Sequence, residues 1–347
     1  EKIMTKRPRL AINGFGRIGR TITKLNMKYQ KFDLVLINDI NPNCDNLAYL
    51  LNYDSTYGRL PQPVQSLDNK MLFGRNSVTV TSVCDLQQIS WGSLDVDVLI
   101  DSSGVSSNVA VAKDLTKREA VRKVVVTHSS SDVDREIILG VNTETLKSDD
   151  AVVSSSICDA NAIAHPLKWI NDEFGIVGGS VTTLHPWLSY QNLVDGPSIS
   201  QSNPGVVWDD FALGRAAGES LIPKNTTALT ATEKVIPEIA GKLLSFSYRI
   251  PTRVVASSDL TLNLGSSITQ EQVEQFLQSQ CAKSDYVRAN YESLVSVDYE
   301  QEEASAVLDL QWTKAIGNTI KIIAWYDNEW AYSARALELA RKCLVDL

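Results

Sequence analysis

Short apolar runs alternate with helical periodicity over the first 130 residues of the chain. Four such runs read RLAINGFG, KFDLVLINDI, DVDVLIDSSG and VRKVVVTHSSS, and each ends in small or polar residues. Apolar side chains on both faces are typical of strands buried inside a parallel sheet. Strands alternating with helices predict a doubly wound α/β fold, whose ligands bind at the carboxyl ends of the strands.

The pattern changes after about residue 150, where the strands become longer and alternate apolar with polar residues. Examples are FGIVGGSVTTLHPWLSY, KLLSFSYRIP and TRVVASSDLTLNLG. They predict an α+β domain with a mixed or antiparallel sheet. We expect a first domain over 1–157, a second over 158–328, and an amphipathic C-terminal helix over 329–347 that packs back on the first.

The composition excludes several classes of protein. The chain has 347 residues, 44% of them hydrophobic and 21% charged, and a formal net charge of −8. This length suits two domains, and the negative charge argues against a nucleic-acid partner. No apolar run reaches the roughly 20 residues of a membrane span. Five scattered cysteines without a CxxC pair favour a cytoplasmic setting, and the three histidines predict no metal site.

The stretch GFGRIG, which contains Gly14, Gly16 and Gly19, follows a predicted strand and begins a helix. In a dinucleotide site these glycines allow a tight turn, close approach of the pyrophosphate, and packing of helix on strand. Asp39 ends the second strand, where its carboxylate would accept hydrogen bonds from a ribose and disfavour NADP. The pattern predicts an NAD site, and the alternative is a purely structural glycine turn.

Cys158 lies in SSSICDANAIAHP, at the expected start of a helix. A helix N-terminus and a nearby imidazole are the usual means of activating a thiol, and His185, which ends a predicted strand, is the best candidate for the imidazole. Buried, inert cysteines are common, so the residues alone leave both interpretations open.

A series of ordered motifs resembles the glyceraldehyde-3-phosphate dehydrogenase family along nearly the whole chain. They are AINGFGRIGR, NYDSTYGRL, the Cys-x-x-Asn at 158–161, FGIVGGSVTTLH, VDGPS, GRAA, IPEIAGKL, YRIPT and WYDNEWAYS. The resemblance implies a Rossmann NAD-binding domain, a catalytic domain, an aldehyde substrate and a homotetramer. The long loop after His185 would line the cofactor site and a subunit interface.

The resemblance also implies roles for individual residues. Cys158 would attack the aldehyde, and His185 would act as the base and hold the thiolate as an ion pair. The residues implied for cofactor binding are Asn13, Gly14, Phe15, Gly16, Arg17, Ile18, Asp39, Thr127, Asn328 and Tyr332. The positions implied for substrate binding are Asp159, Thr226 and Arg249.

Several phosphate-binding positions of the family are altered in this chain. Where the family holds phosphate through hydroxyls, an acid and an arginine, the chain has Ile157, Asp159, Leu188, Tyr190 and Leu213. Two unit charges about 5 Å apart interact by roughly 3 kcal/mol at an effective dielectric of 20. Replacing an arginine by leucine and adding Asp159 should therefore weaken phosphate binding, unless residues such as Lys224 rebuild the site.

Asp159 has several possible roles beside the thiol. A carboxylate there raises the pKa of Cys158, and it would orient His185, a cationic substrate, or a water that attacks the thioester. We therefore expect an NAD-dependent aldehyde dehydrogenase with a changed substrate. The alternatives are an ordinary phosphorylating glyceraldehyde-3-phosphate dehydrogenase with a rebuilt anion site, and a non-catalytic NAD-binding homologue.

Overall fold

A computed structural model describes residues 6–344 of the chain. Residues 1–5 and 345–347, the ends of the predicted ranges 1–157 and 329–347, lie outside the described residues. The chain folds into two units, each formed from more than one stretch of sequence. Unit 1 holds the residues up to Glu136, Leu146–Ser155 and the residues from Ser333 on, and unit 2 holds Ile137–Thr145 and Ser156–Tyr332.

Unit 1 contains a nine-stranded sheet in the order β10-β11-β9-β8-β1-β2-β7-β6-β5. The strands from β10 to β7 pair in parallel, and β6 and β5 continue the sheet in antiparallel fashion. This confirms the predicted doubly wound sheet and adds an antiparallel edge. The strands are β1 (Arg9–Asn13), β2 (Asp33–Asn38), β5 (Gln65–Leu67), β6 (Lys70–Phe73), β7 (Asn76–Thr81), β8 (Val96–Asp101), β9 (Val121–Val126), β10 (Arg135–Glu136) and β11 (Val152–Ser154).

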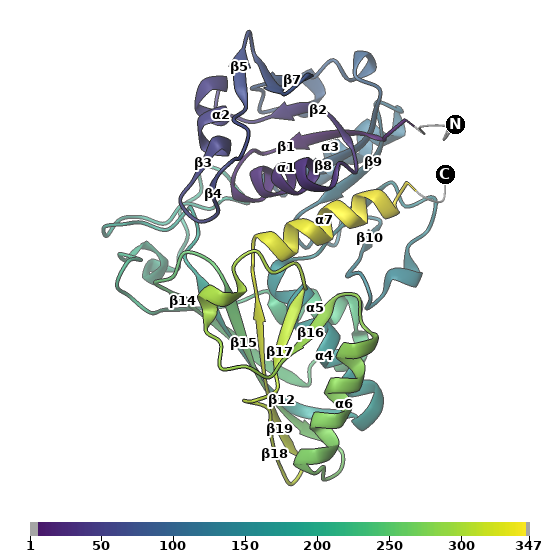
Figure 1. The fold of residues 1–347 in the computed structure, drawn as a ribbon, viewed down its shortest axis with the longest axis vertical. Helices are drawn as coiled ribbons and strands as arrows, with labels where there is room; N and C mark the ends of the chain where they lie inside the picture. The colour runs from purple at the N-terminus through teal and green to yellow at the C-terminus, as the bar shows by residue number, and fades with distance from the viewer. Residues whose placement is uncertain (1–5, 345–347) are drawn as a thin grey trace. The chain divides into compact units, whose positions relative to one another are not determined.

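The helices of unit 1 follow the predicted alternation with these strands (Figure 1). Helix α3 contacts β9 and β11, and its apolar face joins a core with residues of the central strands. The helices are α1 (Arg17–Tyr29), α2 (Cys44–Asn52), α3 (Asn108–Lys117) and most of α7 (Trp330–Lys342), with 3-10 turns η1 (Leu86–Gln88) and η2 (Trp91–Ser93). A small separate ladder joins β3 (Tyr53–Asp54) to β4 (Gly58–Arg59).

Unit 2 contains an eight-stranded mixed sheet in the order β13-β14-β12-β15-β19-β17-β16, with β18 paired to β19. The pairs β12–β14 and β16–β17 are parallel, and the others are antiparallel, as the alternating pattern predicts. The strands are β12 (Ile176–Pro186), β13 (Ile222–Lys224), β14 (Leu243–Ile250), β15 (Ala256–Leu264), β16 (Val287–Asn290), β17 (Ala306–Asp309), β18 (Lys314–Ile316) and β19 (Thr319–Tyr326).

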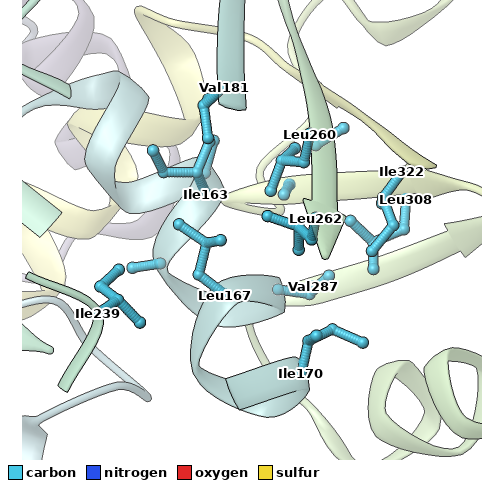
Figure 2. Packing of buried hydrophobic residues seen from close by; sticks show 14 of the residues in the cluster. Ile163, Leu167, Ile170, Val181, Ile239, Leu260, Leu262, Val287, Leu308 and Ile322 are labelled. Carbon is cyan, nitrogen blue, oxygen red and sulfur yellow. The ribbon is translucent and has the colours of Figure 1, made fainter. Parts of the chain in front are cut away.

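Helix α4 (Cys158–Phe174) packs on this sheet through one apolar face. Figure 2 shows Ile163, Leu167 and Ile170 of α4 facing side chains from β12, β15 and β19. This buried face fixes the position of the first turn of α4, where Cys158 lies. The other helices of unit 2 are α5 (Ala228–Val235) and α6 (Gln270–Lys283), with 3-10 turns η3 (Thr143–Thr145), η4 (Phe211–Gly214), η5 (Pro237–Ile239) and η6 (Ser296–Tyr299).

The segment between β12 and β13 is largely irregular, as its Gly, Pro and Ser content predicts. It holds only the turn η4 and an isolated bridge between Ile199 and Val207. Across residues 6–344, no helix combines the length and the apolar character that a membrane crossing requires.

Candidate active site

The glycine-rich turn between β1 and α1 is built around two close backbone approaches. Gly14 has a φ of +84°, and a Cβ there would lie 2.5 Å from the backbone nitrogen of Ser103. A Cβ on Gly19 would lie 2.1 Å from the carbonyl oxygen of Gly14, whereas one on Gly16 would meet no atom within 4 Å. The first and third glycines are thus required by packing, and the second leaves open space for a ligand.

The start of α1 and the end of β2 complete a site that fits a dinucleotide. Helix α1 begins without a side-chain cap and without an acidic residue in its first turn, so its positive end is not neutralised there. The carboxylate of Asp39 accepts the Phe15 N–H at 2.6 Å and the Asn41 N–H at 2.8 Å. These bonds hold the acidic side chain beside the glycine turn, where the dinucleotide fingerprint places it.

Other predicted cofactor residues of unit 1 are held by neighbouring polar groups. Asn13 donates to Asp101 at 2.8 Å and accepts from Asn38 at 2.8 Å, so it joins the ends of three strands. The Thr127 hydroxyl donates to the Asp101 carbonyl at 3.2 Å. Arg17 pairs with Asp54 at 2.8 Å, and Ile18 follows it, half-buried, in the first turn of α1.

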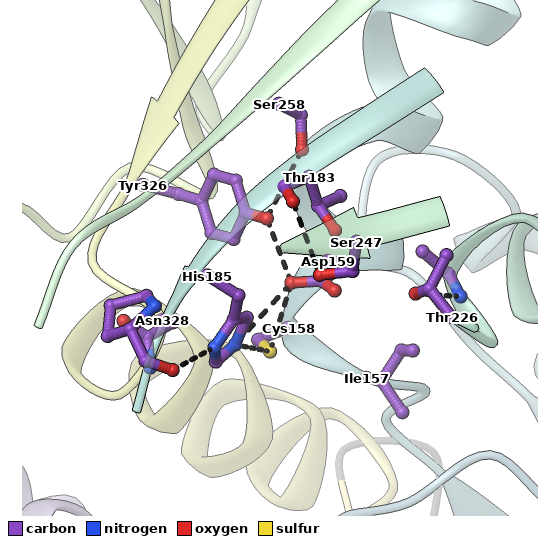
Figure 3. Close-up of polar contacts among 12 residues, drawn as sticks. Ile157, Cys158, Asp159, Thr183, His185, Thr226, Ser247, Ser258, Tyr326 and Asn328 are labelled. Carbon is purple, nitrogen blue, oxygen red and sulfur yellow. Dashed lines mark hydrogen bonds and ion pairs between the residues drawn. The ribbon is translucent and has the colours of Figure 1, made fainter. Parts of the chain in front are cut away.

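Cys158 is the first residue of α4 and lies beside His185 from the end of β12 (Figure 3). Its Sγ is 3.6 Å from Nε2 of His185, although 27 residues separate the two in sequence. Nδ1 of His185 is 2.8 Å from the Pro186 carbonyl, which can only accept. Nδ1 therefore carries the proton, and Nε2 of the neutral ring presents its lone pair to the thiol.

Asp159 points into the same site and is only 6% exposed. Its Oδ1 lies 3.5 Å from Sγ of Cys158 and 3.7 Å from Nε2 of His185. The Tyr326 hydroxyl donates to that Oδ1 at 2.8 Å, and Ser258 lies 3.2 Å from the same hydroxyl. Figure 3 shows these groups converging on one point, with His185 from β12, Ser258 from β15 and Tyr326 from β19 meeting the start of α4. The carboxylate therefore faces the thiol instead of solvent.

The electrostatic setting favours neutral forms of the thiol and the imidazole. Burial and then the Asp159 carboxylate raise the pKa of Cys158 well above its ordinary value. Burial and then Arg249 lower the pKa of His185 to about 4, against the opposing effect of Asp159. The thiolate–imidazolium ion pair that the family resemblance implies is therefore disfavoured, because desolvation penalises both charges.

Two cationic side chains act on this site. Arg249 in β14 is 7% exposed and donates to the Tyr190 hydroxyl at 3.0 Å, while its Nε makes no hydrogen bond with any residue of 6–344. Lys224 lies at the end of β13, and burial and then the Arg249 charge lower its pKa. The Asp159 and Asp210 carboxylates oppose this shift only in part. Arg249 and Lys224 thus form a positively charged environment that suits an anionic group.

The altered family positions take mainly structural roles. Ile157 precedes α4 and packs against the core, and Leu213 is buried in η4. The Leu188 N–H donates to Gln191. Thr226, which is not one of the altered positions, accepts the Ala228 N–H through its hydroxyl at the start of α5. None of these contacts replaces the hydroxyls that the family pattern has at 157 and 188, or its arginine at 213.

Asn328 and Tyr332 lie after β19 and near the start of α7. Oδ1 of Asn328 accepts the Val255 N–H at 3.1 Å. The Tyr332 hydroxyl donates to the Ser156 carbonyl at 2.8 Å, which supports the residue two positions before Cys158. Ser156 itself adopts a φ of +58°, in the left-handed region, where a non-glycine residue is uncommon. The backbone approaching the thiol is thus held in a constrained conformation.

Sequence reasoning missed two features of the site. Tyr326 is 167 residues from Asp159, and no spacing in the sequence indicates their contact. The sequence also predicts no metal site, yet Cys158, Asp159 and His185 bring three ligand-type atoms within 4.8 Å of one another. Both features depend on the pairing of distant strands.

Comparison with known proteins agrees with this geometry. Residues 8–109 match the family model of the glyceraldehyde 3-phosphate dehydrogenase NAD binding domain, and residues 156–328 match its C-terminal domain. Glyceraldehyde-3-phosphate dehydrogenase 3, cytosolic, of Zea mays is 36% identical over 96% of this chain and 97% of its own length. Glyceraldehyde-3-phosphate dehydrogenases of Mucor circinelloides f. lusitanicus and Mastigamoeba balamuthi are 35% and 36% identical, each over 95% of this chain and 96% and 97% of their own lengths.

Proposed function

The chain belongs to the glyceraldehyde-3-phosphate dehydrogenase family, and from this we propose that it oxidises an aldehyde with NAD through a thioester on Cys158. The observation that carries the proposal is the 3.6 Å approach of Cys158 Sγ to the lone pair of His185 Nε2. A nucleophile within reach of a base that a third group orients is the arrangement needed for covalent catalysis.

The thiol starts the reaction. Nε2 of His185 takes the Cys158 proton as Sγ attacks the aldehyde carbon, and the imidazolium returns that proton to the resulting oxyanion, which gives a neutral thiohemiacetal. The neutral His185 then takes the hydroxyl proton of the thiohemiacetal as its carbon is oxidised. The Pro186 carbonyl accepts from Nδ1–H throughout and holds the ring in this orientation.

NAD would supply the hydride acceptor for this oxidation, and the acyl group would then remain on Cys158 as a thioester. The residues of unit 1 that would hold NAD are the glycine turn and Asp39. The open space at Gly16 and the uncapped start of α1 support this assignment.

We further infer that water, and not phosphate, releases the product. Asp159 is buried against Sγ, so its carboxylate repels an anionic acyl acceptor and is placed to take a proton from water. Water attacks the thioester carbon, the C–S bond breaks, and a carboxylic acid leaves as the thiolate regains a proton. The aldehyde then differs from glyceraldehyde-3-phosphate, because Leu188 and Tyr190 remove two of the family's phosphate-binding groups.

A second candidate is the ordinary phosphorylating reaction with a rebuilt anion site. Arg249 and Lys224 favour it, because both cations bear on the site and Nε of Arg249 is buried without a hydrogen bond to a described residue. A non-catalytic NAD-binding role is the third, and the retained Cys158–His185 pair argues against it.

An aldehyde panel assayed with NAD, with and without phosphate, separates these functions. We expect NADH formation that phosphate does not accelerate and a carboxylic acid product. Strict dependence on phosphate with glyceraldehyde-3-phosphate, at a turnover on the order of 10 per second, would establish the second candidate instead. NADH formation in the Cys158→Ser variant at the wild-type rate would contradict the thioester mechanism.

The assembly and the location of the protein are also proposals. We infer a homotetramer, supported by the strongly exposed Leu193, Val194 and Phe211 of the irregular segment after β12. We infer a cytoplasmic location from the five free cysteines and from relatives whose names include the word cytosolic.

A further inference from the structure

We propose that Cys158, Asp159 and His185 form a binding site for a borderline divalent metal ion of the Zn²⁺ class. The inference goes beyond the proposed dehydrogenase activity, and it concerns the same three side chains in a different role. It concerns the protein without substrate, in which the ion and an aldehyde compete for the same sulfur atom.

The three ligand-type atoms form a nearly equilateral triangle. Sγ to Oδ1 is 3.5 Å, Sγ to Nε2 is 3.6 Å, and Nε2 to Oδ1 is 3.7 Å. Typical zinc bond lengths to sulfur, nitrogen and oxygen place the ligand atoms of a tetrahedral site about 3.3 to 3.6 Å apart. The two distances from Sγ fall in this range, and the third exceeds it slightly. An ion can therefore lie over the face of the triangle with a fourth position left for water.

The groups behind the ligands are also those that metal sites use. Ligating histidines donate their second N–H to a carbonyl or a carboxylate, and Nδ1 of His185 contacts the Pro186 carbonyl at 2.8 Å. Ligating carboxylates are themselves hydrogen-bonded, and Tyr326 donates to Oδ1 of Asp159 at 2.8 Å. A carboxylate oxygen has two lone pairs, so one remains for the ion.

The ligand types and their charges select the class of ion. A thiolate with an imidazole favours Zn²⁺, Co²⁺ or Cd²⁺ over Mg²⁺ and Ca²⁺, which prefer oxygen ligands. Cys158 loses its proton to solvent on binding, so the thiolate and the Asp159 carboxylate together neutralise a 2+ ion. A neutral centre is compatible with the neighbouring Arg249 and Lys224, whereas a positive one is not.

Asp159 is the residue that makes this a three-ligand site. A hydroxyl residue at this position, as in the family pattern, would leave only the thiol and the imidazole. We therefore expect the Asp159→Thr and Asp159→Asn variants to bind Zn²⁺ at least tenfold more weakly than the wild-type chain. Tyr326→Phe, which removes the support of the carboxylate, should weaken binding about tenfold.

The experiment uses the full chain, without NAD or substrate, in a Cys84→Ser background that removes an exposed thiol. Zn²⁺ binding is measured by competition with a chromophoric chelator, and Co²⁺ binding by its thiolate charge-transfer absorption. We expect one ion per chain, the charge-transfer band, and loss of both in Cys158→Ser. Equal Zn²⁺ affinity in Cys158→Ser, in Asp159→Asn and in the parent would overturn the proposal, as would a Co²⁺ complex without the band.

A second readout distinguishes a ligand from a charge that merely tunes the thiol. Iodoacetamide labelling of Cys158 should become faster in Asp159→Asn, because a repelling carboxylate is removed, while Zn²⁺ affinity falls. If both quantities rise together, Asp159 is not a ligand and the proposal fails. None of these measurements needs turnover. A protein that binds Zn²⁺ in this way but oxidises no aldehyde would therefore contradict the proposed function and support the metal site.

Discussion

Asp159 makes the thiol of this protein chemically different from one flanked by a hydroxyl. Its buried Oδ1 is 3.5 Å from Sγ of the half-buried Cys158, so the two groups cannot easily carry negative charge together. The Tyr326 hydroxyl partly offsets this repulsion by donating to the same oxygen. Burial raises the pKa of Tyr326 well above its ordinary value, so its hydroxyl keeps its proton and remains a donor.

Asp159→Asn should therefore make Cys158 more reactive at neutral pH. Burial and the Asp159 carboxylate raise the pKa of the thiol, and removing the charge lowers that pKa again. When a thiol is mostly protonated, lowering its pKa by about one gives about a tenfold larger thiolate fraction. We expect iodoacetamide labelling of Cys158, followed by peptide mass spectrometry, to be about tenfold faster. The exposed Asp195→Asn is the control, and equal rates in all three proteins would contradict the prediction.

His185→Asn should remove the base without removing the nucleophile. Loss of a positioned general base costs about 10² to 10⁴ in rate. We expect aldehyde-dependent NADH formation to fall by such a factor while NAD binding, measured by fluorescence quenching, stays unchanged. Turnover within threefold of the wild-type value would show that another group takes the thiol proton.

At the scale of elements, the turn between β1 and α1 uses its glycines for different purposes, and two substitutions separate them. Gly19→Ala places a Cβ 2.1 Å from the Gly14 carbonyl and should lower the free energy of unfolding by about 1–3 kcal/mol. Gly16→Ala meets no atom and should change that free energy by less than about 0.5 kcal/mol. It should nonetheless weaken NAD binding at least tenfold, because the second glycine admits the pyrophosphate.

Urea denaturation and NAD titration of both variants check this pair. A Gly16→Ala protein with normal NAD affinity would mean that the glycine turn is structural. A Gly19→Ala protein of wild-type stability would mean that α1 shifts away from β1 without cost.

The contact between α1 and β3 depends on a buried charge cluster. Asp54 pairs with Lys24 at 2.7 Å and with Arg17 at 2.8 Å. Burial alone would raise the pKa of Asp54. The hydrogen bonds from Lys24 and Arg17 outweigh burial and lower that pKa well below its ordinary value. Burial also lowers the pKa of Lys24, so an ammonium left without its partner is poorly tolerated.

Asp54→Asn should therefore destabilise the fold by about 3–5 kcal/mol at pH 7. A carboxyl whose pKa is lower in the folded state stabilises above its unfolded pKa of about 3.9, and this contribution is lost as the pH falls below that value. The difference between the variant and the wild-type chain should accordingly shrink in acid, as measured by urea midpoints from pH 7 to pH 3. Asp114 pairs with Arg118 on the surface, so Asp114→Asn should change the free energy of unfolding by less than about 1 kcal/mol. A loss as large as that in Asp54→Asn would contradict the role of burial in the Asp54 cluster.

The type of these elements could be predicted from the sequence, but the contacts between distant elements could not. Strands such as β2 and β8 carry apolar residues on both faces, and α4 carries one apolar face, so their type follows from local periodicity. The contact of Tyr326 with Asp159 follows from the pairing of β12 with β15 and of β15 with β19, which no local signal encodes. The same holds for Lys224, which reaches the site only because β13 pairs with β14.

On the scale of the whole molecule, the irregular segment after β12 exposes more apolar surface than a monomer needs. Leu193 is 86% exposed and Phe211 is 82% exposed. If the proposed homotetramer forms through this segment, Phe211→Asp should shift it to smaller species, because the substitution places a charge in the surface that the proposal assigns to a subunit interface. Sedimentation velocity measures the shift, and Ile316→Asp, at an equally exposed residue of β18, is the matched control.

A wild-type chain that sediments as a monomer would contradict the tetramer proposal outright. Equal shifts in Phe211→Asp and Ile316→Asp would show that the segment after β12 has no special part in assembly.

The route of the chain through its two units has a consequence for recombination and for fragment expression. Unit 1 draws on three separate stretches of sequence, and β11 inserts between β10 and β9 after the chain has entered unit 2 and returned. A fragment ending at Glu136 would lack β11 and α7 and would leave β9 with an open edge. A single crossover between two relatives therefore cannot exchange one intact unit, and more than one crossover is needed to move either unit alone.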